Sequence, residues 1–150
     1  MNRAQPKTFS LLVFYRGLHC PACKTYLQAL DRRVAEFHEL GTEPVALSMD
    51  TQERAKKAKD SWEIEHLPIG YELEEDSARR WGLFISDAIS DAEPRRFCEP
   101  GLFLVRASGD LHYVAINSMP FGRPQVDDVV GAVRFILEED YPARGIVSAN

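Results

Sequence analysis

The feature that most constrains the fold is an apolar segment near the N-terminus, residues 9–15 (FSLLVFY), in which polar and apolar residues do not alternate. Such a run is typical of a strand that is buried on both faces, as in the centre of a parallel sheet. Beyond Cys20-Pro21, apolar side chains recur three or four residues apart, at Cys23, Leu27, Leu30, Val34 and Phe37. This spacing predicts an amphipathic helix that begins at Pro21 and follows the buried strand directly.

Later segments continue the pattern of strands and helices. A second apolar run, residues 44–49, is followed by a polar helical stretch towards Trp62, so the first two strands are expected to be parallel neighbours with a right-handed crossover. Two short apolar runs around Ser108-Gly109-Asp110 predict a hairpin, and a last helix is expected over residues 125–139. The expected buried face of that helix consists of Val126, Val129, Val130, Val133 and Leu137.

The order of these elements predicts the fold class. Residues 85–99 show neither the three-to-four-residue apolar spacing of a helix nor the apolar run of a strand, and they are expected to form an irregular insertion. The remaining order, β-α-β-α, a connection and then β-β-α, is that of the thioredoxin-like fold, in which helices flank a central mixed β-sheet. Because 150 residues are about one domain's worth of chain, we expect residues 1–150 to form a single α/β domain.

Composition excludes several classes of function. The formal net charge is −5, which argues against a nucleic-acid partner because such proteins normally present a basic face. The first apolar run is too short to span a membrane or to form the apolar core of a secretion signal. We therefore expect a soluble cytoplasmic protein, in which paired cysteines are more often catalytic or metal-binding than structural.

Two of the three cysteines, Cys20 and Cys23, lie together at the expected junction of strand and helix. Unpaired backbone N–H groups and the helix dipole at a helix N-terminus stabilise a thiolate, so we expect a lowered pKa for Cys20. Cys23 lies about one turn further along, on the apolar face, where it is placed to attack a mixed disulfide at Cys20. The pair thus provides the nucleophile and the resolving thiol that dithiol–disulfide chemistry requires.

Other interpretations of the cysteines stay open. The pair could be two small buried hydrophobic residues, or part of a zinc site completed by Cys98 and one of the four histidines, although no second closely spaced pair of ligands is present. The fold could also persist without catalysis, as an interaction module. Cys98 is either a distal resolving cysteine or a buried structural thiol, and the second interpretation is the stronger.

With these residues identified, the chain resembles the peroxiredoxin-like branch of the alkyl hydroperoxide reductase/thiol-specific antioxidant (AhpC/TSA) family of the thioredoxin superfamily. The resemblance covers roughly residues 9–145. It rests on LLVFYRGLHCPACKTYLQAL, on VALSMD with its Ser-x-Asp ending, on GLFLVRASGDLHYVAIN, and on MPFGRPQVDDVV with Gly-Arg ahead of the last helix. The resemblance implies a thiol-dependent oxidoreductase, for which we expect no metal and no cofactor.

The family's site residues carry over unevenly. The resemblance places Cys20 at the peroxidatic cysteine, which attacks a hydroperoxide and becomes a sulfenic acid, and Arg123 at an arginine found near family active sites. Cys23 matches instead the second cysteine of thioredoxins. The usual threonine three residues before the peroxidatic cysteine is Gly17 here, and the arginine that commonly precedes the Gly-Leu-Phe strand is replaced by Pro100.

Two further residues are expected near the pair because of these departures. Arg16, four residues before Cys20, is either a substitute for the missing guanidinium or an ordinary exposed ion pair. Pro100 is a candidate for the cis-proline that thioredoxin-fold proteins hold opposite their cysteine pair. The expected site therefore comprises two catalytic cysteines with Arg16, Pro100 and Arg123 in support.

Two mechanisms are open to the Cys20–Cys23 pair. In the first, Cys20 attacks a hydroperoxide, Cys23 condenses with the sulfenic acid, and an external thiol reductant restores the dithiol. In the second, Cys20 attacks a protein disulfide and Cys23 resolves it. The family resemblance favours the first mechanism, whereas Gly17 and Pro100 favour the second. Dimers are common for such folds, so a homodimer is one expectation for the assembly.

Overall fold

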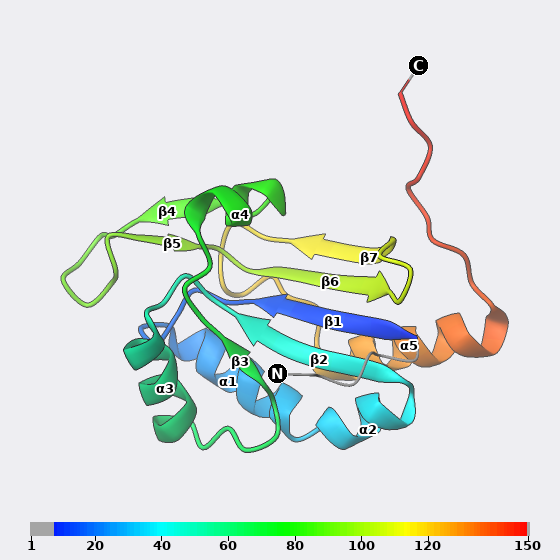
Figure 1. The fold of residues 1–150 in the computed structure, drawn as a ribbon, viewed down its shortest axis with the longest axis horizontal. Coiled ribbons are helices and arrows are strands. Elements are labelled where there is room, and N and C mark those ends of the chain that lie inside the picture. Colours follow the sequence, from blue (N-terminus) through cyan, green and yellow to red (C-terminus); the bar gives the residue numbers. More distant parts are fainter. Residues whose placement is uncertain (1–7, 150) are drawn as a thin grey trace.

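The computed structural model describes residues 8–149, so residues 1–7 and 150 of the expected domain lie outside the described range. A five-stranded sheet forms its centre (Figure 1). In order across the sheet, the strands are β3 (Ile69–Gly70), β2 (Thr42–Leu47), β1 (Phe9–Phe14), β6 (Gly101–Arg106) and β7 (Leu111–Ile116). A separate antiparallel pair consists of β4 (Ile85–Asp87) and β5 (Arg96–Cys98). The helices are α1 (Pro21–Asp31), α2 (Val34–Glu39), α3 (Gln52–Ser61), α4 (Glu75–Arg80) and α5 (Val126–Glu139).

The predicted central strand is confirmed. β1 pairs in parallel with β2 and antiparallel with β6, so the sheet is mixed. Side chains on both faces of β1 are buried, with Leu11 and Val13 in one apolar cluster and Phe14 in another. The expected α/β fold, in which helices flank a central mixed sheet, is therefore confirmed, and so is the hairpin of β6 and β7.

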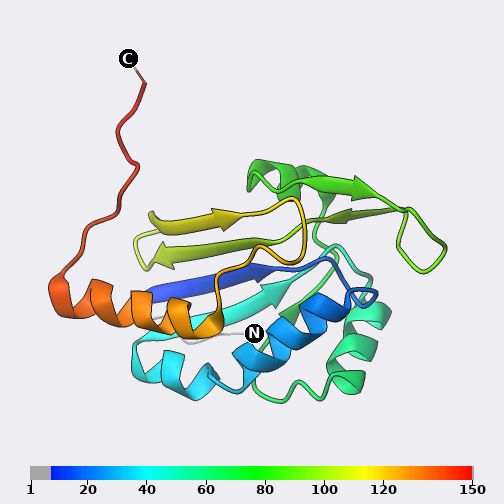
Figure 2. The same cartoon turned by 180° about the vertical axis from the view of Figure 1, so that it is seen from behind.

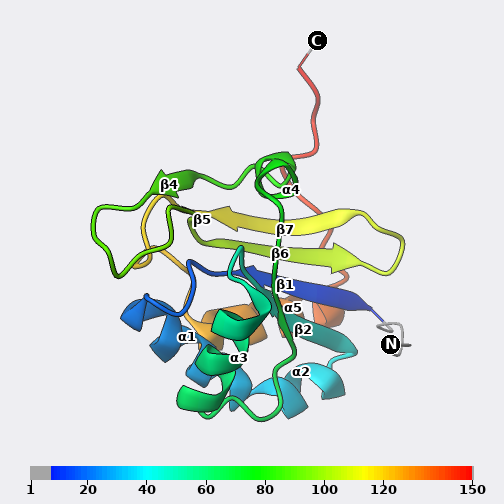
Figure 3. The same ribbon diagram turned by 60° about the vertical axis from the view of Figure 1, so that its left-hand side comes forward.

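The two apolar clusters define three layers. The larger cluster joins one face of the sheet to α1, α2, α3 and α5, and these helices lie together on that side in Figures 1 and 2. Right-handed crossovers from β1 to β2 and from β2 to β3 explain why α1, α2 and α3 share a face, because both connections run in the same direction across the sheet. The smaller cluster joins the other face to α4 and β5, and the β4–β5 pair extends from that side in Figure 3.

The first helix is interrupted where the apolar spacing predicted one continuous helix. α1 ends at Asp31 and α2 begins at Val34. Asp31, the last residue of α1, is only 8% exposed although it carries a charge. Its carboxylate accepts backbone N–H groups from Glu65 at 3.2 Å and from His66 and Leu67 at 2.7 Å. These bonds fasten the end of α1 to the segment that leads into β3.

Two other local expectations need correction. The segment of residues 85–99 is not an irregular insertion throughout, because its two ends pair as β4 and β5, and Phe97 and Cys98 are buried. In α5 the buried residue of the fourth turn is Ile136, three positions after Val133, whereas Leu137 is 40% exposed. Within residues 8–149 no helix is both long enough and apolar enough to cross a membrane.

Candidate active site

Cys20 lies at the start of α1, where the sequence predicted it. Its backbone is extended, and its Sγ accepts the backbone N–H of Cys23 at 3.2 Å. Pro21 follows as the first helical residue, a position at which the missing N–H of proline costs no hydrogen bond. The Cys20 carbonyl accepts the N–H of Lys24 at 3.0 Å, which is the first hydrogen bond of the helix. Cys20 is therefore held at the start of α1 through both its carbonyl and its sulfur.

The loop before Cys20 is held in place by Asp50, which follows β2. Asp50 is 3% exposed, and its carboxylate accepts the N–H of Leu18 at 2.8 Å and the Nε of Arg54 at 3.0 Å. Gly17 has a φ of +136°, and a Cβ at this position would lie 2.8 Å from both carboxylate oxygens of Asp50. A threonine therefore does not fit this loop, which explains why the chain departs from the family pattern at Gly17.

Cys23 is fully buried one turn into α1, and Arg123 lies against it. The Arg123 Nη2 donates to the Cys23 Sγ at 3.1 Å, although the two residues are 100 positions apart. The Arg123 guanidinium is fixed by a second bond to the Pro120 carbonyl at 3.2 Å and by the ring of Tyr26, 5.0 Å away. The Tyr26 hydroxyl donates to the Pro124 carbonyl at 2.8 Å, so the loop before α5 is fastened to α1.

Arg16 lies beside the other sulfur. Its guanidinium is close enough to Cys20 to favour the Cys20 thiolate and so to act against the rise of the Cys20 pKa. The Arg16 Nε is 3.1 Å from the Glu99 carboxylate, and the guanidinium carbon is 4.8 Å from the centre of the Phe97 ring. The side chains of Arg16 and Glu99 are 19% and 5% exposed. Arg16 therefore forms a mostly buried ion pair and at the same time contacts the cysteine pair.

The two thiols of the pair do not ionise alike. Burial opposes the ionisation of Cys23, but the hydrogen bond with Cys20 and the charge of Arg123 outweigh it and lower the pKa of Cys23 to about 6. The pKa of Cys20 is raised instead, by its hydrogen bond with Cys23 and by burial. The expectation of a lowered pKa for Cys20 is therefore wrong for the reduced pair. The pair carries its negative charge on Cys23, next to Arg123.

Pro100 is not a cis-proline, since every peptide bond within residues 8–149 is trans. The residue is buried directly before β6, and its carbonyl accepts the N–H of Asn117 at 3.0 Å, just beyond β7. This position extends the pairing of β6 and β7 with a trans backbone. The interpretation of Pro100 as a cis-proline opposite the cysteines is therefore wrong.

Cys98 lies apart from the pair, in the smaller apolar cluster on the other face of the sheet. Its side chain is fully buried, and its Sγ donates to the Tyr15 carbonyl at 3.5 Å. Burial raises the pKa of Cys98 to about 12. These surroundings are those of a structural thiol, which was the stronger of the two interpretations.

Sequence reasoning missed two residues that position the site, Asp50 and Tyr26. Asp50 belongs to the Ser-x-Asp ending of the second apolar run, so a signal was present, but its contact with the cysteine loop was not foreseen. Tyr26 gave no signal, because its hydrogen bond spans 98 positions. His19 is also close to the site. Both of its ring nitrogens are buried without a hydrogen-bond partner within residues 8–149, and burial lowers its pKa.

The zinc interpretation gains no support from the arrangement of side chains. Among residues 8–149, no group of three or more histidine, cysteine, aspartate or glutamate side chains could hold a metal ion. Cys98 contributes to the opposite face of the sheet from the pair, so it cannot complete a site with Cys20 and Cys23.

Comparisons with known proteins agree with the geometry. Residues 3–114 match the sequence model of the AhpC/TSA family. A search of curated proteins found no match. Among solved structures, a peroxiredoxin-like protein from Aquifex aeolicus has 18% identity and a TM-score of 0.68, with 84% of this chain and 70% of that chain covered. A reduced 2-Cys peroxiredoxin from Plasmodium vivax has 21% identity and a TM-score of 0.69, with coverages of 95% and 77%. AhpC from Enterococcus faecalis has 22% identity and a TM-score of 0.71, with coverages of 97% and 83%.

These matches confirm the resemblance drawn from the sequence. The structural neighbours show a shared fold, and the family model spans well over half of the chain. A purely non-catalytic module and a protein-disulfide exchanger are not favoured by this assignment. The chain belongs to the AhpC/TSA family, and it is a thiol-dependent oxidoreductase.

Proposed function

We propose that the protein reduces hydroperoxides, with Cys20 as the attacking thiolate and Cys23 as the resolving thiol. The observation that carries this proposal is that each sulfur has its own guanidinium, Arg16 beside Cys20 and Arg123 on Cys23. Cleavage of a peroxide bond develops negative charge on sulfur and oxygen in turn, and preformed donors aimed at that charge lower the barrier. In the family, an arginine commonly precedes the Gly-Leu-Phe strand, where this chain has Pro100. Arg16 thus supplies the guanidinium in its place.

The inverted ionisation of the pair fits this chemistry. In the resting dithiol the Cys23 thiolate accepts the proton of the Cys20 thiol, which generates the Cys20 thiolate as peroxide enters. That thiolate attacks the terminal peroxide oxygen, so an S–O bond forms while the O–O bond breaks. The departing alkoxide takes the proton from Cys23 and leaves as the alcohol. Cys20 is then a sulfenic acid, and Cys23 is again a thiolate.

The second step forms the disulfide, and it needs no prior proton transfer because Cys23 is already a thiolate. The Cys23 thiolate attacks the Cys20 sulfur, the S–O bond breaks, and the hydroxide released takes a proton from solvent to give water. The pKa of Cys23 is about 6 in the reduced pair, and the charge of Arg123, which the oxidation of Cys20 does not remove, favours the thiolate that this attack requires. An external dithiol then reduces the Cys20–Cys23 disulfide. We place this cycle in the cytoplasm, where such reductants are maintained, and we expect the protein to act there as a homodimer.

The test is to trap the sulfenic acid with a dimedone probe and locate it by mass spectrometry after one equivalent of hydrogen peroxide. Cys23→Ser is expected to accumulate the adduct at Cys20, because no thiol resolves it. Cys20→Ser is expected to give no adduct at Cys23, and Cys98→Ser should behave as the native chain. An adduct at Cys23 in the Cys20→Ser protein would show that Cys23 is the attacking thiolate. Peroxide consumption no faster than that of free cysteine would reject the peroxidase function itself.

A further inference from the structure

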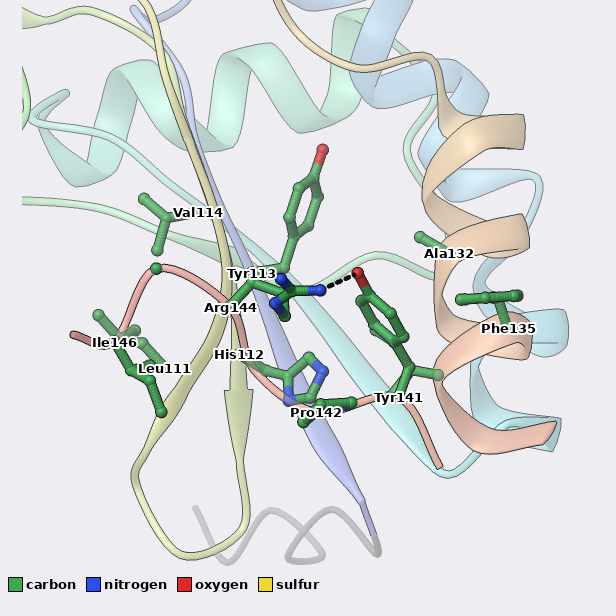
Figure 4. Close-up of a pocket in the computed structure, with 12 residues that line it drawn as sticks. Leu111, His112, Tyr113, Val114, Ala132, Phe135, Tyr141, Pro142, Arg144 and Ile146 are labelled. Carbon is green, nitrogen blue, oxygen red and sulfur yellow. Dashed lines mark hydrogen bonds between the residues drawn. The ribbon is translucent and has the colours of Figure 1, made fainter. Parts of the chain in front are cut away.

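A cavity of about 650 Å³ lies between β7, α5 and the segment that follows α5 (Figure 4). This volume is within the range of sites that bind small molecules. Most of the lining is apolar, contributed by Leu111, Val114, Ala132, Phe135, Ile136 and Ile146. Phe135 is 51% exposed, with its ring 5.2 Å from that of Tyr141, and Ile146 is 72% exposed, so both present apolar surface beside the cavity.

The cavity is at the opposite end of the sheet from the cysteines. Phe9, the first residue of β1, pairs with Arg106, and the adjacent Val105 pairs with Leu111 at the start of β7. Cys20 follows the far end of β1. Likewise, α5 begins next to the Arg123 loop and ends beside the cavity. A molecule in this cavity therefore does not contact the thiol pair, and the inference below is independent of the peroxidase proposal.

His112 is an unpaired polar side chain in the lining of this cavity. It is 8% exposed, and both of its ring nitrogens are buried without a hydrogen-bond partner within residues 8–149. Figure 4 shows its ring beside Tyr141 and Pro142; the main chain of Tyr141 comes near the ring, but neither ring nitrogen forms a hydrogen bond with acceptable geometry. Buried polar groups are nearly always paired, so an unpaired group beside a cavity indicates where a polar atom of a ligand would lie.

The charges around the cavity favour an anion. Arg144 lines it and is held at its rim by a hydrogen bond from Nη1 to the Tyr141 hydroxyl at 3.0 Å. The other titratable side chains of the lining are His112, Tyr113 and Tyr141, and no aspartate or glutamate of the described chain is among them. One fixed positive charge and an unpaired imidazole, next to an apolar surface, match a molecule with an apolar body and a single anionic head.

We propose that this cavity binds a fatty-acid-type carboxylate. The carboxylate lies between His112 and Arg144, where it accepts a hydrogen bond from the imidazole and one from the guanidinium. The alkyl chain lies along Leu111, Val114 and the face of α5 that carries Ala132 and Ile136. Binding of this molecule covers the exposed Phe135 and supplies the missing partner of His112.

The test is calorimetric titration of the reduced full chain with decanoate, below the concentration at which it forms micelles. Decanol and decyltrimethylammonium serve as ligands of the same length with a neutral and a positive head. Decanoate is expected to bind with a stoichiometry of one, about tenfold more tightly than decanol. The cation is expected not to bind. In parallel, the ¹⁵N signals of the His112 ring are expected to shift with decanoate. Failure of decanoate to bind up to its solubility limit would overturn the proposal.

Three variants locate the binding site. Ala132→Trp fills the cavity and is expected to abolish binding of both decanoate and decanol, while circular dichroism and peroxide consumption stay unchanged. Arg144→Gln is expected to weaken decanoate about tenfold and to leave decanol unchanged. Arg134→Gln, on α5 but paired with Glu36 outside the cavity, is the control that also removes one arginine charge, and it is expected to bind decanoate normally.

Two outcomes would contradict the assignment of site and occupant. Unchanged decanoate binding in Ala132→Trp would place the ligand elsewhere on the molecule. Sedimentation analysis tests the other occupant, a second copy of the chain. A native dimer that Ala132→Trp converts to monomer would show that the cavity is a subunit contact and would overturn the fatty-acid proposal.

Discussion

The three cysteines are equally buried but differ in their chemistry. Cys20, Cys23 and Cys98 are each at most 1% exposed. Burial raises the pKa of Cys98 to about 12, whereas the pKa of Cys23 is lowered to about 6 although burial opposes its ionisation too. The difference comes from the groups around each sulfur. A guanidinium and a second thiol contact Cys23, while apolar side chains and one backbone carbonyl surround Cys98.

This contrast shows that exposure alone does not set the pKa of a thiol in this protein. Donors placed at the N-terminus of α1 and in the loop before α5 create one ionised sulfur inside the protein. The same degree of burial without a guanidinium or a second thiol leaves Cys98 with a raised pKa, as expected of an unreactive thiol. The peroxidase proposal therefore depends on the arrangement of charges around the pair, and four experiments can break or sharpen the comparison.

The largest effect is expected when the pair is removed and Cys98 is left as the remaining thiol. The double variant Cys20→Ser/Cys23→Ser should react with hydrogen peroxide at least roughly a thousandfold more slowly than the native chain, because no guanidinium or second thiol stabilises charge at Cys98 and burial opposes it. Cys98→Ser should keep the native rate. Stopped-flow measurement of peroxide consumption compares the three proteins, and a rate loss in Cys98→Ser would mean that this cysteine takes part in catalysis.

The second effect concerns the pH dependence of stability. The contributions of Cys23 and Cys98 to the free energy of unfolding should change with pH in opposite directions. The folded pKa of Cys23, about 6, is below the ordinary thiol value of 9.0. Its contribution to the free energy of unfolding is therefore fully present above pH 9.0 and is lost as the pH falls through about 6. The folded pKa of Cys98 is raised to about 12, so its contribution is present below pH 9.0 and is lost as the pH rises towards 12.

Urea unfolding of the reduced protein across this pH range measures both contributions. Each shift corresponds to an upper bound of roughly 4 kcal/mol, since one pKa unit is about 1.4 kcal/mol. In Cys23→Ala the increase in stability between pH 6 and pH 9.0 should disappear, and in Cys98→Ala the loss above pH 9.0 should shrink. Identical pH profiles in the native chain and in Cys23→Ala would show that Cys23 carries no charge in the folded state.

The third effect concerns the loop that holds Cys20. Gly17→Ala should destabilise the protein by about 3 kcal/mol, because the backbone has a positive φ and the new Cβ would meet the Asp50 carboxylate. Gly109→Ala is the matched control, since Gly109 also has a positive φ, +95°, but has no atom within 4 Å of the added Cβ. We expect it to cost about 1 kcal/mol. Equal costs in urea unfolding would show that Asp50 does not confine the loop.

The parts of the molecule that could be predicted from the sequence are those specified by neighbouring residues. The apolar run of residues 9–15 and the helical spacing after Pro21 place β1, α1 and the two cysteines correctly. The hairpin of β6 and β7 follows from two apolar runs and the turn around Gly109. In each case the pattern that predicts the element also fixes which face is buried.

The parts that could not be predicted depend on contacts between distant segments. Asp31 is buried because three N–H groups of residues 65–67 reach it, and no local pattern indicates that partner. The ionisation of the pair was predicted the wrong way round for the same reason. The position of Cys20 at a helix N-terminus was visible in the sequence, but the contact of Arg123 with Cys23, 100 residues away, was not.

The smallest effect tests that contact directly. Arg123→Met keeps an unbranched, flexible side chain and removes its charge, so the pKa of Cys23 should rise by about one unit, roughly 1.4 kcal/mol of lost thiolate stabilisation. Ultraviolet absorbance of the thiolate during a pH titration measures this pKa, in a Cys98→Ser background so that the signal comes from the pair. Arg134→Met removes a charge from α5 that contacts Glu36 and no cysteine, and it should leave the pKa unchanged.

Arg16→Met separates the roles of the two guanidinium groups. Because Arg16 lies beside Cys20, its loss should slow the reaction with peroxide while the pKa of Cys23 stays low. If Arg123→Met left the lower thiol pKa of the pair unchanged and Arg16→Met raised it, that pKa would belong to Cys20, and the resting charge would lie next to Arg16. The contrast with Cys98 would then rest on Cys20, and Cys23 would serve only to resolve the sulfenic acid.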